Sequence, residues 1–170
     1  MNVEHEIYNI VDENDCITGQ ASRKNIHQNK LLHRSAHILV FNSRRELFLQ
    51  KRALCKDESP GLWDTSAAGH VDAGESYDAC AHRELFEELH LKAVLKPSMK
   101  ISACQETHEE HVQVYTCTTD ETIQVNSEEI SEGAFFGLAQ IQKNISANPA
   151  QFTSSFKLLF NQTLNNENIS

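Results

Sequence analysis

This chain of 170 residues has little of what would place it in several large classes of protein. It has only 6 glycines and 3 prolines, too few for a collagen-like or low-complexity chain. No apolar run approaches the ~18–20 residues that a membrane span needs, and the polar stretch at residues 1–9 lacks the apolar segment of a signal peptide. We therefore expect a cytoplasmic protein with no membrane contact.

The cysteines also lack a pattern. There are five of them, an odd number, and no two form a C-x-x-C pair: Cys16, Cys55, Cys80, Cys104 and Cys117. This scatter argues against a disulfide scaffold or a zinc ribbon, and it indicates reduced thiols.

Positive charge is in short supply. The chain has 15 Lys and Arg against 24 Asp and Glu, so its formal net charge is −9, and it has no long basic run. Such a chain is poorly suited to holding duplex nucleic acid through bulk charge. It can still bind a small phosphate compound if metal cations neutralise its carboxylates locally.

What is present predicts one α/β domain, because the length fits a single domain and 39% of the residues are apolar. Strands are expected near 6–11, 16–21, 37–42, 46–51, 62–68, 100–103, 112–118 and 134–137, and two helices are expected at 138–145 and 152–164. Residues 23–31 read as a short helix or a loop. The mixture favours an α/β sandwich on one mixed β-sheet.

The best-defined helix spans residues 76–89 and begins at Ser76, a good N-cap. An apolar residue recurs at every fourth position, which predicts one buried stripe: Tyr77, Ala81, Leu85 and Leu89.

Three glutamates share a face of this helix. At ~100° per residue, Glu87 lies about 60° from Glu84 on one side and Glu88 about 40° on the other. Like charges at this spacing repel, and a divalent cation would remove that cost. Oxygen ligands without a thiolate favour Mg²⁺ or Mn²⁺ over zinc. A solvated acidic helix face is the alternative reading.

The residues around these glutamates resemble the Nudix box, G-x5-E-x7-R-E-U-x-E-E-x-G-U, where U is apolar. Gly69, Glu75 and the run from Arg83 to Glu88 match it, and Leu91 fills the last apolar place. The departure is His90, which replaces a glycine expected to end the helix with positive φ. Histidine tolerates that conformation at a cost of ~1 kcal/mol.

The resemblance implies a Nudix-type α/β/α sandwich around a mixed sheet, with residues 1–170 as a single domain. An N-terminal β-hairpin would occupy about 5–22, the box 69–91 and the C-terminal helices about 138–165. It also implies roles for the box residues. Glu84, Glu87, Glu88 and the carbonyl of Gly69 would bind Mg²⁺ or Mn²⁺, while Glu75 and Arg83 would brace the loop against the helix.

Family members hydrolyse a nucleoside diphosphate linked to another group, by attack of water on phosphorus. The general base varies, and the candidates here are the box glutamates and three loop carboxylates: Glu106, Glu109 and Glu110. Each loop carboxylate can also be an ordinary exposed side chain.

A narrower resemblance, to the isopentenyl-diphosphate isomerase branch of the superfamily, rests on residues 31–34, 50–53 and 60–63, on Lys56, and on the Gly69-His70 pair. Those isomerases use a cysteine just before that pair, and the position here is Ala68. Without the thiol, one of the two acid/base groups is missing.

The same branch builds a second metal site from histidines and glutamates. His27, His33, His70, Glu109 and His111 fall near its positions, and Glu110 is a further candidate; structural histidines are the alternative. Lys51 and Arg52 could contact a substrate phosphate, or they could be a surface pair at a strand end. Trp63 could stack on a base, but a place under the sheet is favoured.

Three hypotheses follow. The first, favoured, is a Mg²⁺-dependent diphosphate hydrolase acting on a small molecule. The second is an isomerase of isoprenoid diphosphates, which Ala68 disfavours. The third is a non-catalytic module that binds a nucleotide or a partner. An exposed strand near the N-terminus could also pair with a second chain in a homodimer.

Overall fold

The computed structural model describes residues 6–167. The chain begins with an antiparallel hairpin of β1 (Ile7–Val11) and β2 (Ile17–Ser22), followed by helix α1 (Arg23–Asn29). The hydroxyl of Ser22 caps this helix by accepting from the amide of Asn25. The hairpin therefore lies where the sequence predicts it, although residue 5 is outside the described part of the chain.

The main sheet has seven strands. They are β3 (His33–Phe41), β4 (Glu46–Arg52), β5 (Trp63–Asp64), β6 (Ala67–His70), β7 (Lys96–Ile101), β8 (Glu110–Thr118) and β9 (Ile130–Gly137). The pairing of β3 with β8 is parallel and the others are antiparallel, so the sheet is mixed. β3 and β4 pair only at Phe41 and Leu47, beside their turn. From there the two strands take different partners, β6 for β3 and β5 and β9 for β4.

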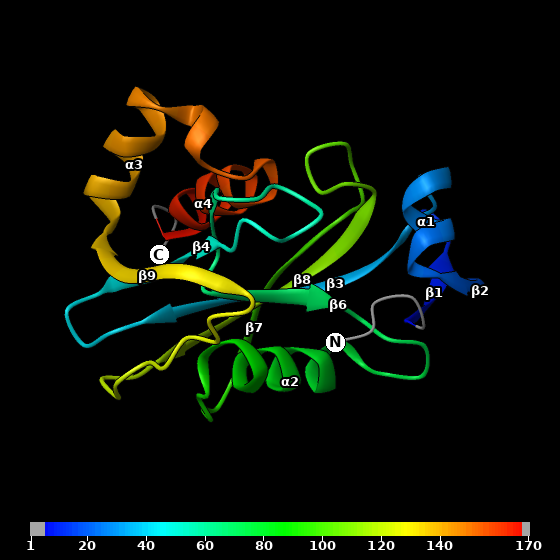
Figure 1. Ribbon diagram of the computed structural model, residues 1–170, viewed down its shortest axis with the longest axis horizontal. Coiled ribbons are helices and arrows are strands. Elements are labelled where there is room, and N and C mark those ends of the chain that lie inside the picture. Colours follow the sequence, from blue (N-terminus) through cyan, green and yellow to red (C-terminus); the bar gives the residue numbers. More distant parts are fainter. Residues whose placement is uncertain (1–5, 168–170) are drawn as a thin grey trace.

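Helices cover both faces of this sheet (Figure 1). α2 (Tyr77–Leu89) lies against one face, while α3 (Leu138–Ala147) and α4 (Ser154–Glu167) lie on the other side, joined by a short 3-10 turn at Pro149–Gln151. Strand β3 serves both cores because its side chains alternate. Ile38 packs under α2, whereas Leu39 packs with the residues of α4. The expected α/β/α sandwich is confirmed.

The ends of α2 match their prediction. Ser76 is the N-cap and its hydroxyl accepts from the amide of Ala79, while His90 ends the helix with φ of 52°. Ala81, Leu85 and Leu89 are buried. The same helix stripe that the sequence shows is therefore the one that packs against the sheet.

One expected strand is wrong. The stretch 62–68, read as continuous, is divided into β5 and β6. The hydroxyl of Ser66 donates to the carbonyl of Phe48 and accepts from the amide of Val40. Ser66 therefore bonds to both β3 and β4 through its side chain at the point where these strands separate. Gly69 lies inside β6 and does not end it.

Among residues 6–167, no helix is both long enough and apolar enough to cross a membrane.

Candidate active site

A cavity of about 980 Å³ opens beside β6, at the end of the sheet that holds the hairpin and α1. All three glutamates of the α2 face line it, together with Gly69 and His70. Residues from β3, β4, β8 and the start of α4 complete the wall. The cavity is therefore lined by residues from segments spread along most of the chain, with the box residues among them.

Glu88 reaches back from α2 to the edge of β6. It is 5% exposed, and its Oε2 accepts from the amide of Ala68 at 3.0 Å and from Nε2 of Gln50 at 2.9 Å. Burial raises the pKa of Glu88 above its usual range. The two hydrogen bonds fix the carboxylate between β4 and β6 at the cavity wall.

Glu84 lies against Gly69, and the two fit so closely that any side chain at position 69 would displace the carboxylate of Glu84. A β-carbon built on Gly69 would lie 1.9 Å from Oε1 of Glu84. Burial, and next the charge of Glu88, raise the pKa of Glu84 above its usual range. Two buried carboxylates beside a bare backbone form an oxygen-rich cradle that suits a hard divalent cation.

Arg83 binds the loop to the helix. Its Nε and Nη2 donate to the two oxygens of Glu75 at 3.0 and 2.9 Å, and Nη2 also donates to the carbonyl of His70 at 3.1 Å. The remaining Nη1 contacts Glu84 and Glu87. This arrangement matches the bracing predicted for the Glu75–Arg83 pair and holds two of the three cavity glutamates in place.

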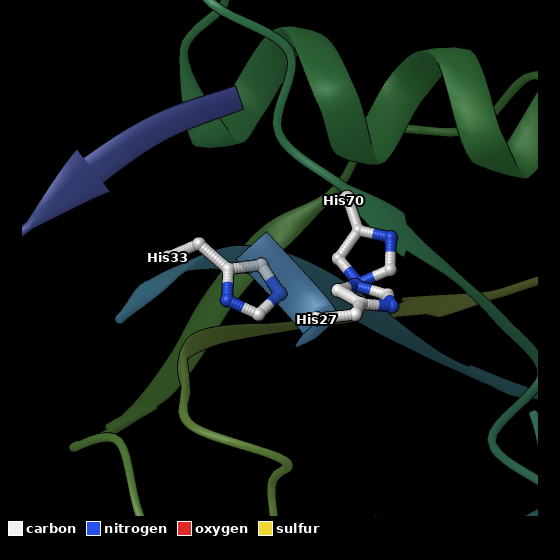
Figure 2. A group of neighbouring side chains, drawn as sticks. All are labelled: His27, His33 and His70. Atoms are coloured by element: carbon white, nitrogen blue, oxygen red, sulfur yellow. The ribbon is translucent and has the colours of Figure 1, made fainter. Parts of the chain in front are cut away.

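A second cluster of side chains lies at the other end of β6. The imidazoles of His27, His33 and His70 face one another (Figure 2), and one nitrogen from each lies within 4.8 Å of the others. They come from α1, β3 and β6, respectively. Oε1 of Glu110, on β8, lies 3.0 Å from Nε2 of His70 and 3.7 Å from Nε2 of His33.

The hydrogen bonds of two of these rings leave a free nitrogen. Nδ1 of His33 lies 2.8 Å from the carbonyl of Leu31, and Nδ1 of His27 lies 2.8 Å from Glu58. In both rings Nε2 is buried and has no hydrogen-bond partner within the described residues. Burial lowers the pKa of His33 to about 4, which keeps it neutral. A neutral ring bonded through Nδ1 is how metal-binding histidines are held, so the cluster fits a transition metal ion.

Comparison with known proteins identifies the family. The family model of the NUDIX domain matches residues 31–156. This chain belongs to the Nudix family.

Relatives within the family carry two kinds of name. An isopentenyl-diphosphate Delta-isomerase of Pectobacterium atrosepticum is 34% identical over 89% of this chain and 87% of its own length. An uncharacterized Nudix hydrolase of Pseudomonas aeruginosa is 38% identical over 74% of this chain and 75% of its own length. These relatives confirm the similarity to the isomerase-like branch that the flanking residues predict.

The solved structures give the same fold. The crystal structure of DR0079 from Deinococcus radiodurans superposes with a TM-score of 0.84 at 25% identity, and it covers 92% of this chain and 98% of that one. The likeness extends over nearly the whole sandwich, helices included.

The other predicted site residues fall into two groups, those that line the cavity and those that do not. Arg52, His70 and Glu110 line the cavity, whereas Lys51, Glu106 and Glu109 do not. Neighbouring residues of a strand point to opposite faces, and Lys51 accordingly lies over the ring of Trp63 and 3.6 Å from Glu132. A phosphate contact by Lys51 is not supported. Trp63 is half-buried and packs edge-on against Phe136 rather than facing the cavity.

His111 also lies apart from the histidine cluster. Its Nε2 lies 3.0 Å from the carbonyl of Asp12, and its Nδ1 lies 3.4 Å from the amide of Ala103. It follows Glu110 on β8 and so faces the opposite side of the sheet. The structure therefore does not bring His111 to the histidine cluster, whereas Glu110 lies beside it.

Two side chains that line the cavity were missed by the sequence analysis. His37 and Asp64 are each 5% exposed, and both line it. The available signal was a polar residue at the start of an apolar strand segment, since His37 directly precedes Ile38, Leu39 and Val40. Alternation alone could not reveal that these residues share a wall.

Proposed function

We propose that this chain is a divalent-metal-dependent Nudix hydrolase that cleaves a diphosphate linkage in a small molecule by attack of water on phosphorus. A nucleoside diphosphate derivative is the expected substrate class. The observation that carries the proposal is the convergence of Glu84, Glu87 and Glu88 on one cavity beside Gly69, with Arg83 bonded to Glu75.

The residues that would hold the metal are these three glutamates and the carbonyl of Gly69. The cradle at Gly69 fits, because its donors are oxygens and a β-carbon would fill the space. When bound, Mg²⁺ or Mn²⁺ would supply activation of the attacking water and neutralisation of the diphosphate.

Other residues would position the substrate. Arg52 lines the cavity with its Nε donating to the carbonyl of Glu58 at 3.0 Å, so its guanidinium is held where a phosphate would lie. Of the three candidate carboxylates, Glu110, at the start of β8, lines the cavity, whereas Glu106 and Glu109 do not. Glu110 is a candidate base as an alternative to a role in binding a second metal ion. The box glutamates are the alternative base.

The histidine cluster supports a second metal ion, held by His27, His33, His70 and Glu110. Two buried imidazole nitrogens that have no hydrogen-bond partner among the described residues support this set. Imidazole ligands suit zinc and other transition metal ions better than Mg²⁺.

Isopentenyl-diphosphate isomerisation is the second candidate, favoured by the names of several relatives and by this histidine cluster. Ala68 weighs against it. A methyl group cannot exchange a proton, and the nearest buried thiol, Cys80, lies in α2 with burial raising its pKa above its usual range. A non-catalytic binding module is the third reading. The cytoplasmic location and a homodimer through the N-terminal strand stay predictions.

The test is a release assay for phosphate and monophosphate across a panel of diphosphates that includes isopentenyl diphosphate, with Mg²⁺ and with Mn²⁺. We expect turnover of at least one hydrolysable compound, abolished by chelator and by Glu88→Gln. The same panel is examined for isomerised isopentenyl diphosphate. Isomerisation without hydrolysis would establish the second candidate, and binding without turnover would establish the third.

A further inference from the structure

His37 lies at the part of the cavity where the missing thiol would be. It pairs directly with Ala68 across β3 and β6. Side chains of opposite residues in an antiparallel pair lie on the same face, roughly 5 Å apart. The imidazole and the small methyl group of Ala68 therefore form one stretch of the cavity wall.

The ring is held in one orientation. Nδ1 of His37 lies 2.9 Å from Oγ1 of Thr65, and that hydroxyl donates to the carbonyl of Ala67 at 3.4 Å. With its proton directed to Ala67, the hydroxyl accepts the Nδ1 proton of His37. Burial lowers the pKa of the imidazole, which favours the neutral ring. Nε2 is then a hydrogen-bond acceptor on a residue that lines the cavity.

The wall around His37 is polar and fixed. Asp64 accepts from the amide of Thr65 at 2.8 Å and from the hydroxyl of Thr153 at 3.0 Å, and Arg52 lies 3.7 Å from its second oxygen. Asp64, Thr153 and the neighbouring Ser155 are all buried, and all line the cavity. Buried polar groups that are already paired stay in place when a ligand enters.

Large apolar side chains are few in the lining, where Ile7 and Tyr8 of the hairpin are the main ones among the described residues. Over the part of the chain that the structure describes, no leucine, valine, methionine, phenylalanine or tryptophan lines the cavity. Its largest aliphatic side chain is Ile7, which belongs to the hairpin and is 43% exposed. An isoprenoid tail placed against His37 would desolvate polar groups and gain little apolar contact.

We propose that His37 is a specificity-determining residue whose Nε2 accepts a hydrogen bond from a hydroxyl or amino group on the organic part of a polar diphosphate. The cavity thereby selects such compounds over isoprenoid diphosphates. This inference rests on the proposed function for one point, the anchoring of the diphosphate at the glutamates and Arg52.

Equilibrium binding tests it without needing turnover. Calorimetry with Ca²⁺ in place of Mg²⁺ compares ADP, UDP-glucose, isopentenyl diphosphate and methylenediphosphonate on wild type, His37→Phe and His37→Gln. We expect wild type to bind ADP or UDP-glucose at least tenfold more tightly than isopentenyl diphosphate. His37→Phe should lose about tenfold for the polar ligand, and His37→Gln should recover part of that loss.

Two controls separate specificity from damage to the fold. Methylenediphosphonate has no organic group to reach His37, so its affinity should stay within twofold in every variant. His111→Gln, which removes a buried imidazole outside the cavity, should leave all four affinities unchanged. If His37→Phe melts well below wild type, the affinities of His37→Gln and Thr65→Val are compared with wild type instead. Thr65→Val removes the hydroxyl that contacts Nδ1 of His37.

Two outcomes overturn the inference. If methylenediphosphonate binds but the preference for polar ligands is absent, or is the same in His37→Phe, the specificity role fails while the proposed function stands. If no diphosphate binds wild type at all, both fail.

Discussion

The site has two clusters of candidate metal ligands, one whose glutamates all line the cavity and one that reaches the cavity through His70 and Glu110, and the chain builds them in different ways. The glutamates come from five consecutive residues of one helix, 84–88, and the helix period alone brings them together. The histidines come from α1, β3 and β6, and their glutamate from β8. That second cluster depends on strand register: Ser35 pairs with His70, and His33 with Glu110.

Register decides the second cluster because a shift of one residue would turn every side chain to the other face. His111, one residue after Glu110, shows the consequence by bonding to Asp12 on the opposite side. A local cluster is therefore robust to how the sheet is assembled, and a cluster built across strands is not. The two are joined by Arg83, which contacts Glu84 in one and the carbonyl of His70 in the other.

The largest effect should come from breaking the glutamate cluster. Replacing a metal ligand costs more than the ~10–100-fold typical of the residues that support it. We therefore expect Glu87→Gln to lower the rate of Mg²⁺-dependent diphosphate hydrolysis by more than ~100-fold, measured as initial release of monophosphate.

Glu109→Gln is the matched control, because this substitution removes the same negative charge from a residue that does not line the cavity. It should retain the wild-type rate within about twofold. A Glu87→Gln protein that keeps a tenth of the activity would contradict the assigned role.

Breaking the histidine cluster should have the next largest effect, on metal binding. Metal-stripped wild-type protein should bind Mn²⁺ or zinc at a second site, and His33→Gln, which removes a proposed ligand, should weaken that site by about 100-fold or more, since loss of a supporting residue alone costs ~10–100-fold. Calorimetry measures affinity, and elemental analysis after dialysis measures the number of ions.

In the same experiment, Glu87→Gln should leave the second site intact and His111→Gln should change neither site. Equal losses in His33→Gln and His111→Gln would mean that the histidines are structural. A single site in every protein would remove the distinction between the clusters.

Gly69→Ala sharpens the comparison inside the glutamate cluster. The added β-carbon would lie 1.9 Å from Oε1 of Glu84, so the carboxylate that Arg83 holds must move. Displacement of a catalytic group by about 1 Å costs up to ~100-fold, and we expect a rate loss of roughly tenfold. Gly137→Ala is the control, since a β-carbon there meets nothing within 4 Å. Equal rates in the two variants would show that the close approach at Gly69 has no function.

The sequence could predict the sandwich, the hairpin, the caps of α2 and the shared face of the glutamates, since each depends on local spacing. It could not predict that β5 and β6 separate, because the break lies where the hydroxyl of Ser66 makes two hydrogen bonds to strands distant in sequence, one to β3 and one to β4. It could not place His37 opposite Ala68 or choose Glu110 over His111 either. Both depend on register, which is set by packing across the whole sheet.

The smallest expected effect concerns the one departure from the box. His90 holds φ of 52° at the end of α2, and its Nδ1 lies 3.0 Å from the carbonyl of Gln124 in an exposed contact. Glycine adopts this conformation without strain, so His90→Gly should stabilise the fold by ~0.5–1 kcal/mol, less whatever the exposed hydrogen bond contributes. For a chain of this size, that raises the melting temperature by about 1–4 °C. His82→Gly, at an exposed position inside the same helix, should instead cost about 0.3–0.5 kcal/mol, the difference between the helix propensities of glycine and histidine. Opposite signs in urea unfolding, with the hydrolysis rate unchanged in both, would show that the box glycine serves the helix end and not the metal cradle. A loss of stability in His90→Gly would mean that the bond to Gln124 outweighs the strain.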